Sequence, residues 1–533
     1  MQGTTTRSGE ERTRGAGSGV HDRALLAEVA PSGWRNPAPE GRYDLVVIGG
    51  GPAGLVAALG AAGMGRRVAL IEQHRLGGDC LNAGCVPSKA LIASGRALAA
   101  ARRAPRLGVR LEGEPRADFP AVMERTRRLR AGLAPADGAG RLQAAGVALH
   151  FGAAHFTGRD TLEVAGQRLR FGRALIATGA RPALPALPGL EEVLATGVLP
   201  VLTSDTVFEL EALPARLAVI GAGAIGCELS QAFARLGARV HLIEGGRGLL
   251  PEEEPELRER LREALAVDGV ELHGGGDDAA LEVDERGARL RLGAGGEGRV
   301  LEVDALLLAT GRTPNVEALD LEAAGVARGP AGVRVDDHLR TTNPRIYAAG
   351  DVCTAVRTTH GADAMARIVL RNALFPYLPG KARLSRRVIP RTLYTDPELA
   401  RVGPTAAELR ARGIRFETLK VDLASVDRAR LEEEEGALIL HVSRGLRGGR
   451  ILGASLLGAQ AGEILPLLTL ALTEGIPLHR LAGVLHAYPT RAEVIKRAAD
   501  AHLRRRLLDL RDRILRPWTL LGIARPLSRL SPP

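Results

Sequence analysis

The stretch from Tyr43 to Gly54 reads YDLVVIGGGPAG. It opens with a continuous apolar run, which is typical of a strand buried in a parallel sheet. Gly49, Gly51 and Gly54 then follow in the pattern G-x-G-x-x-G. An Ala- and Leu-rich helix and a second strand come next, and Glu72 ends that strand. The glycines allow a pyrophosphate to approach the helix N-terminus, and Glu72 is placed to accept a hydrogen bond from a ribose hydroxyl. The stretch therefore predicts a dinucleotide-binding βαβ unit.

The same pattern recurs later in the chain. Its glycines are Gly221, Gly223 and Gly226, and the acid that ends the next strand is Glu244. In both copies the acid stands eighteen positions after the last glycine. Two copies predict two dinucleotide sites, and a flavin with a nicotinamide dinucleotide is the natural pair in a redox enzyme.

Two cysteines follow the first copy directly, in the segment GGDCLNAGCVPSK at residues 77–89. On a regular helix, the offset of five from Cys80 to Cys85 separates them by about 140° and puts their Cα atoms too far apart for an easy disulfide. A bridge needs a distorted turn, and strained bridges are the redox-active ones. From the pair alone, two buried free cysteines are the alternative.

Taken together, these motifs resemble the pyridine nucleotide-disulfide oxidoreductases, which include glutathione reductase, dihydrolipoamide dehydrogenase and mercuric reductase. The resemblance covers about Tyr43 to Asp500. It implies an α/β fold with two Rossmann-like dinucleotide-binding domains, for FAD and NAD(P), and a C-terminal α+β dimerisation domain. The segments that we expect are a disordered N-terminal tail (1–41), the first part of the FAD domain (42–185), the NAD(P) domain (186–308), the second part of the FAD domain (309–385), the dimerisation domain (386–500) and a basic tail (501–533).

The position of the cysteines assigns the two cofactors. A dithiol that exchanges electrons with a flavin should lie near it, so the first glycine motif is the expected FAD site. The second motif is then the nicotinamide site. Glu244 would repel a 2′-phosphate, which favours NADH, while the nearby Arg247 leaves NADPH possible.

Other cofactor residues follow from the resemblance. Thr178-Gly179 and, after the second copy, Gly311 end strands that in the family mark chain crossings between the FAD and nicotinamide domains. The segment TTNPRIYAAGD, residues 341–351, resembles the family's second flavin motif. This likeness implies that Asp351 bonds the ribityl chain.

The resemblance also implies the route of the electrons. NADH would deliver a hydride to the flavin, and the reduced flavin would pass both electrons to a Cys80–Cys85 disulfide. Cys85 would be the charge-transfer thiolate beside the flavin, and Cys80 the interchange thiol that meets the substrate. Lys89 and Glu228 match the lysine and glutamate that pair near the flavin ring.

The family's acid–base histidine is replaced here. Tyr488 stands directly before the Pro-Thr-x-x-Glu element whose glutamate, Glu493, orients that base, and His486 lies two residues earlier. A tyrosine has a reference pKa of about 10 and is a poor base at neutral pH; His486 is the alternative. Tyrosine at this position, like the segment 362–375, resembles the mercuric reductase branch, whose soft metal ion is held by thiolates and needs no proton shuttle. That branch also has a vicinal C-terminal cysteine pair, whereas no cysteine follows Cys353 here. A thiol, a disulfide or a soft metal therefore all stay open as acceptors.

Two other functions are compatible with the sequence. One is dihydrolipoamide dehydrogenase, with His486 as the base. The other is a membrane-associated electron-transfer flavoprotein, since Leu503, Leu507, Leu510 and Ile514 recur at helical spacing beside several arginines. A helix packed on the body, with a frayed end after Pro517, is the simpler interpretation of that segment.

Composition excludes further classes. The net charge is +11 with a pI near 10.2, but the arginines are spread through the chain and no nucleic-acid motif accompanies them. Four cysteines do not make a secreted disulfide framework, no metal-ligand pattern stands out, and no secretory signal is evident. Residues 45–65 carry no charge, but their glycines and proline favour strand, turn and helix over a membrane span.

We expect a cytoplasmic homodimer that acts on a small-molecule acceptor.

Overall fold

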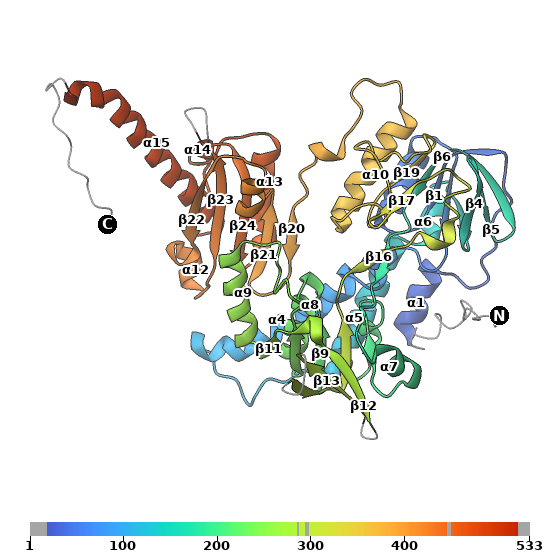
Figure 1. Ribbon diagram of the computed structural model, residues 1–533, viewed down its shortest axis with the longest axis horizontal. Helices are drawn as coiled ribbons and strands as arrows, with labels where there is room; N and C mark the ends of the chain where they lie inside the picture. Colours follow the sequence, from blue (N-terminus) through green and yellow to red (C-terminus); the bar gives the residue numbers. More distant parts are fainter. Residues whose placement is uncertain (1–18, 285–286, 294–297, 445–448, 521–533) are drawn as a thin grey trace. The chain divides into compact units, whose positions relative to one another are not determined.

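The computed structural model describes residues 19–520 apart from 285–286, 294–297 and 445–448, and it divides into two compact units (Figure 1). The first unit takes the chain up to Pro251 together with 265–387, and the second takes 252–264 together with the chain from Val388. The expected NAD(P) domain of 186–308 stays a prediction, and residues 252–264, which it includes, group with the second unit. Glu254 accepts a hydrogen bond from the buried His441 at 2.8 Å, and Glu253 pairs with Arg401 at 3.1 Å, because buried carboxylates need partners.

The first sheet of the first unit carries the first glycine motif. Its parallel strands run in the order β3-β2-β1-β6-β19, and the outer part of β6 continues into an antiparallel meander with β5 and β4. The alternating side chains of β1 face two cores: Leu45 and Val47 lie in one, and Val46 and Ile48 in the other. The strands are β1 (Arg42–Ile48), β2 (Val68–Glu72), β3 (Ala148–Phe151), β4 (Ala154–Gly158), β5 (Thr161–Val164), β6 (Gln167–Ile176) and β19 (Ile346–Ala348).

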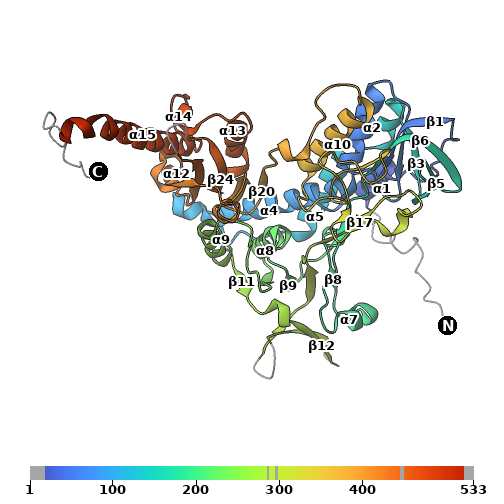
Figure 2. The ribbon, with the colours of Figure 1, turned by 45° about the horizontal axis from the view of Figure 1, so that its top comes forward.

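Helices α2 (Pro52–Gly63) and α10 (Thr359–Leu374) pack against each other over one of these cores (Figure 2). The uncharged residues 45–65 form strand, turn and helix as predicted. Among the described residues, no helix is both long and apolar enough to cross a membrane.

The second sheet of the first unit carries the second glycine motif. Its five parallel strands have the order β11-β10-β9-β15-β8, and a three-stranded meander, β12-β13-β14, shares its core. Two short antiparallel strands, β7 and β16, pair where the chain leaves and re-enters the first sheet. The bounds are β7 (Ala180–Pro182), β8 (Val201–Leu202), β9 (Arg216–Ile220), α8 (Ala224–Leu236), β10 (Arg239–Ile243), β11 (Val270–His273), β12 (Ala280–Asp284), β13 (Gly287–Leu292), β14 (Arg299–Glu302), β15 (Ala305–Leu308) and β16 (Arg312–Pro314).

The second unit is built on a five-stranded antiparallel sheet of order β20-β21-β24-β23-β22. Helices α13 (Ala461–Thr473) and α15 (Glu493–Leu520) contact it. Helix α15 continues through Pro517, so the predicted end there is wrong; residues 521–533 of the predicted tail lie outside the described residues. The strands are β20 (Arg391–Leu393), β21 (Glu398–Val402), β22 (Phe416–Asp422), β23 (Ala437–Ser443) and β24 (Ile451–Gly458).

The N-terminal segment corrects a further expectation. Residues 1–18 lie outside the described residues, but Val20–Val29 form helix α1, so a tail without structure up to residue 41 is wrong. Asp22 is 2% exposed and pairs with Arg130 of helix α5 (Phe119–Leu133) at 3.1 Å. Trp34 donates a hydrogen bond to the carbonyl of Leu149 at 3.3 Å. The error arose from composition, because the Gly-, Ser- and Arg-rich beginning of the chain gave no sign of the ten-residue helix that follows it.

Candidate active site

The two glycine loops have the same close backbone contacts at their first and third glycines. A Cβ on Gly54 would lie 1.8 Å from the carbonyl oxygen of Gly49, and one on Gly226 would lie 1.9 Å from that of Gly221. The first glycines, Gly49 and Gly221, have φ of +108° and +109°. Packing and backbone conformation therefore require glycine at the first and third positions of both motifs.

Packing does not require the middle glycines, and this observation tests the fit of a cofactor. A Cβ on Gly51 would meet only the Cα of Gly78 at 3.7 Å, and one on Gly223 would meet no atom within 4 Å. Each glycine is the N-cap of its helix, α2 or α8, and no described side chain caps either end. The space and the unpaired amide groups suit a pyrophosphate, so the residues fit two dinucleotides.

The acids of the two motifs are both buried. Glu72 accepts hydrogen bonds from the Gly50 amide at 2.7 Å and the His74 amide at 2.8 Å, which hold its carboxylate beside the first loop, while burial raises its pKa. Glu244 follows β10 directly and is 8% exposed. Asp277, which the motif did not predict, accepts from the amide of Gly246 at 2.8 Å and adds a second carboxylate beside this loop.

The cysteines lie on two consecutive helices, α3 (Gly78–Asn82) and α4 (Cys85–Arg103). The two helices are separated by a turn at Gly84, where a Cβ would lie 2.8 Å from the carbonyl oxygen of Asp79. Cys80 is half-buried, and Cys85 is the first residue of α4. Both are free thiols, which corresponds to the reduced form of the expected pair. The turn at Gly84 is the interruption of the helix that a bridge between cysteines five positions apart requires.

The surroundings of the two thiols differ. The pKa of Cys85 is lowered to about 5, chiefly by a hydrogen bond from Cys80, and also by Thr359 and by the Lys89 charge. The Thr359 Oγ1 lies 3.3 Å from the Cys85 Sγ. The pKa of Cys80 is raised by the same hydrogen bond and by burial. The reduced pair therefore carries its first negative charge on Cys85, at a helix N-terminus that favours a thiolate.

Lys89 and Glu228 meet as the family pattern predicted. The Lys89 Nζ lies 2.8 Å from the Glu228 Oε2, although the residues are 139 positions apart. Lys89 lies one helical turn after Cys85 on α4, and Glu228 lies on α8 directly after the second glycine motif. The pair therefore links the cysteine helix to the second loop.

Asp351 follows β19 and belongs to a charged cluster that no sequence motif indicated. Arg312 bonds Asp79, and its Nε lies 3.7 Å from the Asp351 Oδ2. Burial raises the pKa of Asp351 and raises that of Asp79 to about 6. Because β1, β2, β6 and β19 are parallel, Asp351 lies at the same sheet edge as Gly49, as expected for a cofactor residue.

Thr178, Gly179 and Gly311 lie where the chain crosses between the two sheets. The Thr178 hydroxyl donates to the carbonyl of Asn315 at 2.7 Å, and the Asn315 amide donates to the carbonyl of Gly179 at 3.0 Å. Gly311 accepts from the amide of Ala183 at 2.9 Å. These hydrogen bonds join the segment of residues 178–183 to the segment of residues 311–315, next to the paired strands β7 and β16.

The C-terminal candidates are in the second unit. Tyr488 is 71% exposed, and its hydroxyl donates to Asp427 at 3.0 Å, a bond that raises the tyrosine pKa. Glu493 accepts from the amide of Thr490 at 3.4 Å. His486 is half-buried, and its Nδ1 lies 3.0 Å from the carbonyl oxygen of Val484. Within this chain, Asp427 rather than Glu493 is the hydrogen-bond partner of Tyr488.

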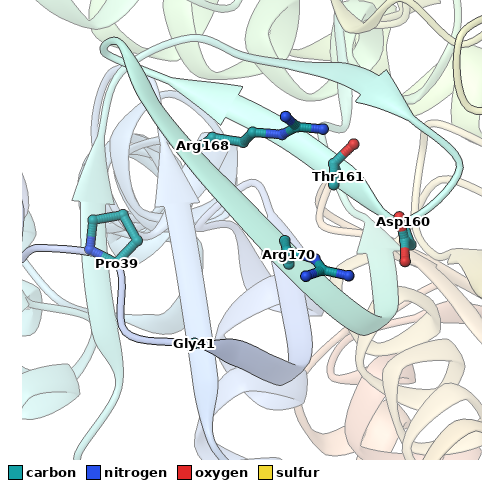
Figure 3. A pocket seen from close by; sticks show the side chains of 6 residues that line it. All are labelled: Pro39, Gly41, Asp160, Thr161, Arg168 and Arg170. Carbon is teal, nitrogen blue, oxygen red and sulfur yellow. The ribbon is translucent and has the colours of Figure 1, made fainter.

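A polar cavity of about 330 Å³ lies elsewhere in the first unit (Figure 3). It is lined by Pro39, Gly41, Asp160, Thr161, Arg168 and Arg170. Gly41 precedes β1, whereas the first glycine loop follows β1. The cavity is therefore at the opposite end of that strand from the nucleotide edge.

Two glycine loops and a dithiol with one acidified thiol define a class: oxidoreductases that link two dinucleotides to a cysteine pair. Comparison with known proteins gives the family. The model described as "Pyridine nucleotide-disulphide oxidoreductase" matches residues 43–366, and the model of the family's dimerisation domain matches 389–499. The chain belongs to this family of FAD- and NAD(P)-dependent disulfide oxidoreductases, and its second domain indicates a homodimer.

The relatives fall into two groups of different function. A mercuric reductase of Staphylococcus aureus is 35% identical over 462 residues, which cover 86% of this chain and 82% of the relative. A dihydrolipoyl dehydrogenase of Bacillus subtilis (strain 168) is 33% identical over 471 residues, covering 86% of this chain and 96% of the relative. Among solved structures, the HOCl-induced flavoprotein disulfide reductase RclA from Escherichia coli matches with a TM-score of 0.74 at 28% identity, over 86% of this chain and 99% of that one.

Proposed function

We propose that this enzyme takes electrons from NADH and passes them through the Cys80–Cys85 pair to a soft metal ion or a small thiol or disulfide acceptor, as mercuric reductase-like enzymes do. The observation that carries the proposal is the asymmetry of the two cysteines. Cys85 is the first residue of helix α4, and its pKa is lowered to about 5, whereas the pKa of Cys80 is raised. Bound FAD and NADH would supply the hydride and its passage to the protein.

The chain's own residues would divide the work as follows. When two electrons reach the Cys80–Cys85 disulfide, the S–S bond breaks, Cys85 stays a thiolate and Cys80 takes one proton. Lys89, paired with Glu228, keeps a positive charge near that thiolate. Cys80 would then lose its proton to solvent, and its thiolate would attack an acceptor disulfide to form a mixed disulfide and release one thiolate. Cys85 would attack the Cys80 sulfur, release the second thiolate and re-form the Cys80–Cys85 disulfide. A soft metal ion would instead be held by both thiolates and leave reduced by two electrons as the same disulfide re-forms.

The C-terminal segment favours an acceptor that needs no strong base. The Tyr488 hydroxyl donates to Asp427 and has a raised pKa, so it stays neutral at pH 7 and does not remove protons. A soft metal ion displaces the Cys80 proton to solvent when it binds to the two thiolates, so this acceptor needs no proton-shuttling base. This supports the mercuric reductase-like acceptor.

Dihydrolipoyl dehydrogenase is the second candidate, and His486 is the observation that favours it. Its Nδ1 lies against the carbonyl of Val484, which leaves Nε2 as the basic nitrogen if Nδ1 carries the proton. This candidate requires NAD⁺ reduction by dihydrolipoamide that is lost in His486→Gln. Absence of that turnover in the unmodified enzyme excludes it.

The first test is an anaerobic titration of the purified enzyme with NADH, followed by its long-wavelength absorbance. A charge-transfer band that is lost in Cys85→Ser but kept in Cys353→Ser supports the relay. Cys353 is the matched control because burial raises its pKa to about 12, so it stays a thiol. Flavin reduction without the band in the unmodified enzyme contradicts the relay and favours an electron-transfer flavoprotein whose cysteines are dispensable.

The acceptor is tested by adding Hg(II), a low-molecular-weight disulfide or lipoamide to the NADH-reduced enzyme and measuring reoxidation. We expect NADH consumption with Hg(II) that stops in Cys80→Ser. Turnover with disulfides alone would replace the soft-metal assignment by a disulfide reductase.

A further inference from the structure

Two histidines and one glutamate form a cluster in the second sheet, on strands that carry neither redox cysteine. His241 lies on β10, and Glu271 and His273 lie on β11. The strands are parallel with His241 opposite Glu271, so the three side chains share one face of the sheet. His241 and His273 are 3% and 9% exposed, while Glu271 is half-exposed.

The three facing atoms are spaced as metal ligands are. The His241 Nδ1 lies 3.1 Å from the His273 Nε2 and 3.4 Å from the Glu271 Oε2, and the last two atoms are 4.0 Å apart. A point equidistant from these atoms lies about 2.1 Å from each, which matches the usual zinc bonds to imidazole nitrogen and carboxylate oxygen. No rearrangement of the strands is needed to reach this geometry.

We propose that His241, Glu271 and His273 bind one divalent transition-metal ion of the zinc type. Two imidazoles select this class over Mg²⁺ and Ca²⁺, which prefer oxygen ligands throughout. Three protein ligands leave a fourth position for water, on the side that Glu271 opens to solvent. This site goes beyond the proposed electron relay and does not depend on it.

Two arginines set the conditions for binding. Arg239 donates to the Glu271 Oε1 at 2.8 Å and so fixes the carboxylate with Oε2 toward the histidines, as an outer-shell partner does. The Arg299 Nη1 lies 3.4 Å from the His273 Nδ1, and its Nη2 lies 3.8 Å from the Glu271 Oε2. Arg299 thus supplies positive charge where the ion would bind, but its side chain is 60% exposed and can turn to solvent. The ion competes with Arg299.

The test is calorimetric titration of the full chain with Zn²⁺ alone, after chelation, in a Cys80→Ser, Cys85→Ser background. The background is needed because thiolates also bind zinc. We expect one strong site per chain. Loss of the ligand in Glu271→Gln should weaken it by at least about 100-fold, since loss of an outer-shell partner already costs 10–100-fold. Arg299→Gln should bind at least as tightly as the parent.

Controls separate binding from folding. Glu271 is half-exposed, so Glu271→Gln should fold, whereas His150→Ala removes a fully buried histidine of β3 outside the cluster and should keep the site. Visible absorption of Co²⁺ in the parent and in His273→Ala checks nitrogen ligation directly. Absence of strong Zn²⁺ binding in the parent, or unchanged affinity in Glu271→Gln, overturns the proposal.

Discussion

The structure lowers the pKa of Cys85, and this shift can be tested by chemical labelling. Its pKa of about 5 predicts that iodoacetamide alkylates it in the reduced enzyme at a rate that is half-maximal near pH 5, because the thiolate is the nucleophile. The thiolate forms above that pH, so the rate falls only below it, whereas an ordinary cysteine loses reactivity below about pH 8.5. Mass spectrometry of labelled peptides over pH 4–9 measures the profile.

Thr359 offers a matched change for that profile. Thr359→Val removes the hydroxyl 3.3 Å from the Cys85 Sγ while keeping the side-chain volume. Loss of a hydrogen bond to a charged group, worth about 1.5–3 kcal/mol, should raise the pKa of Cys85 by about 1–2. Cys353 should stay unlabelled throughout. A profile centred near pH 8.5 in the unmodified enzyme would contradict the assignment of Cys85 as the thiolate.

We expect single residues to decide the choice of nicotinamide nucleotide as well. Glu244 and Asp277 put two carboxylates at the segment that follows β10, where the 2′-phosphate of NADPH would bring further negative charge. The double change Glu244→Ser, Asp277→Asn should lower the ratio of kcat/KM for NADH over NADPH by about tenfold or more, equivalent to about 1.4 kcal/mol. Glu302→Gln, an exposed acid of β14, is the control. An unchanged ratio would mean that these acids do not face the 2′-position.

Local motifs predicted residues whose chemistry depends on neighbours in sequence. The glycines and both cysteines were accessible in this way, whereas the pairing of Lys89 with Glu228, 139 positions apart, was implied by the family resemblance. Thr359, Arg312 and Asp277 were missed because no motif marks them: each reaches the site through the topology of the sheets. Thr359 lies just before the family-like segment 362–375, but its role could not be predicted without knowing that the start of α10 lies next to Cys85.

At the scale of elements, helix α1 yields a prediction about stability. Asp22 is buried and pairs with Arg130. Arg130 also donates hydrogen bonds to Glu209 and to the carbonyl of Asn82, each at 3.0 Å, and Asn82 is the last residue of helix α3, which contains Cys80. Asp22→Ala leaves a buried guanidinium with less compensation and should cost about 3 kcal/mol. The urea midpoint of the first unfolding transition measures the loss.

The matching control for α1 removes both partners. Asp22→Ala with Arg130→Met should recover part of the lost stability, because a buried pair replaced by apolar groups is often nearly neutral. A loss below about 0.5 kcal/mol in the single variant is the size of a surface effect and would mean that α1 contributes little.

Periodic elements were predictable, and elements defined by distant contacts were not. The strands and helices of both glycine motifs follow from apolar runs and glycines. Helix α1 and the transfer of residues 252–264 to the second unit depend on partners more than a hundred positions away, such as Arg130 for Asp22 and His441 for Glu254. The sequence contains those charges, but it does not indicate which of them meet.

At the scale of the whole molecule, the family's dimerisation domain indicates that two chains associate. The cysteines belong to the first unit and Tyr488 to the second. In the family, as the resemblance implies, the second domain completes the active site of the partner subunit. The expected consequence is that each site uses cysteines from one chain and the Tyr488 segment from the other.

Subunit mixing tests this arrangement directly. Cys80→Ser and Tyr488→Asp chains should each form inactive homodimers, because one lacks the exchange thiol and the other replaces the Tyr488 hydroxyl by a charge next to Asp427. After unfolding and refolding an equal mixture, random pairing makes half of the dimers hybrid, and each hybrid has one intact site. Activity should return to about a quarter of the unmodified value, since the two-fold symmetric interface exchanges equivalent segments. If each site used its own chain, the hybrids would contain no intact site and the mixture would stay inactive. A refolded sample of the unmodified enzyme sets the scale for recovery.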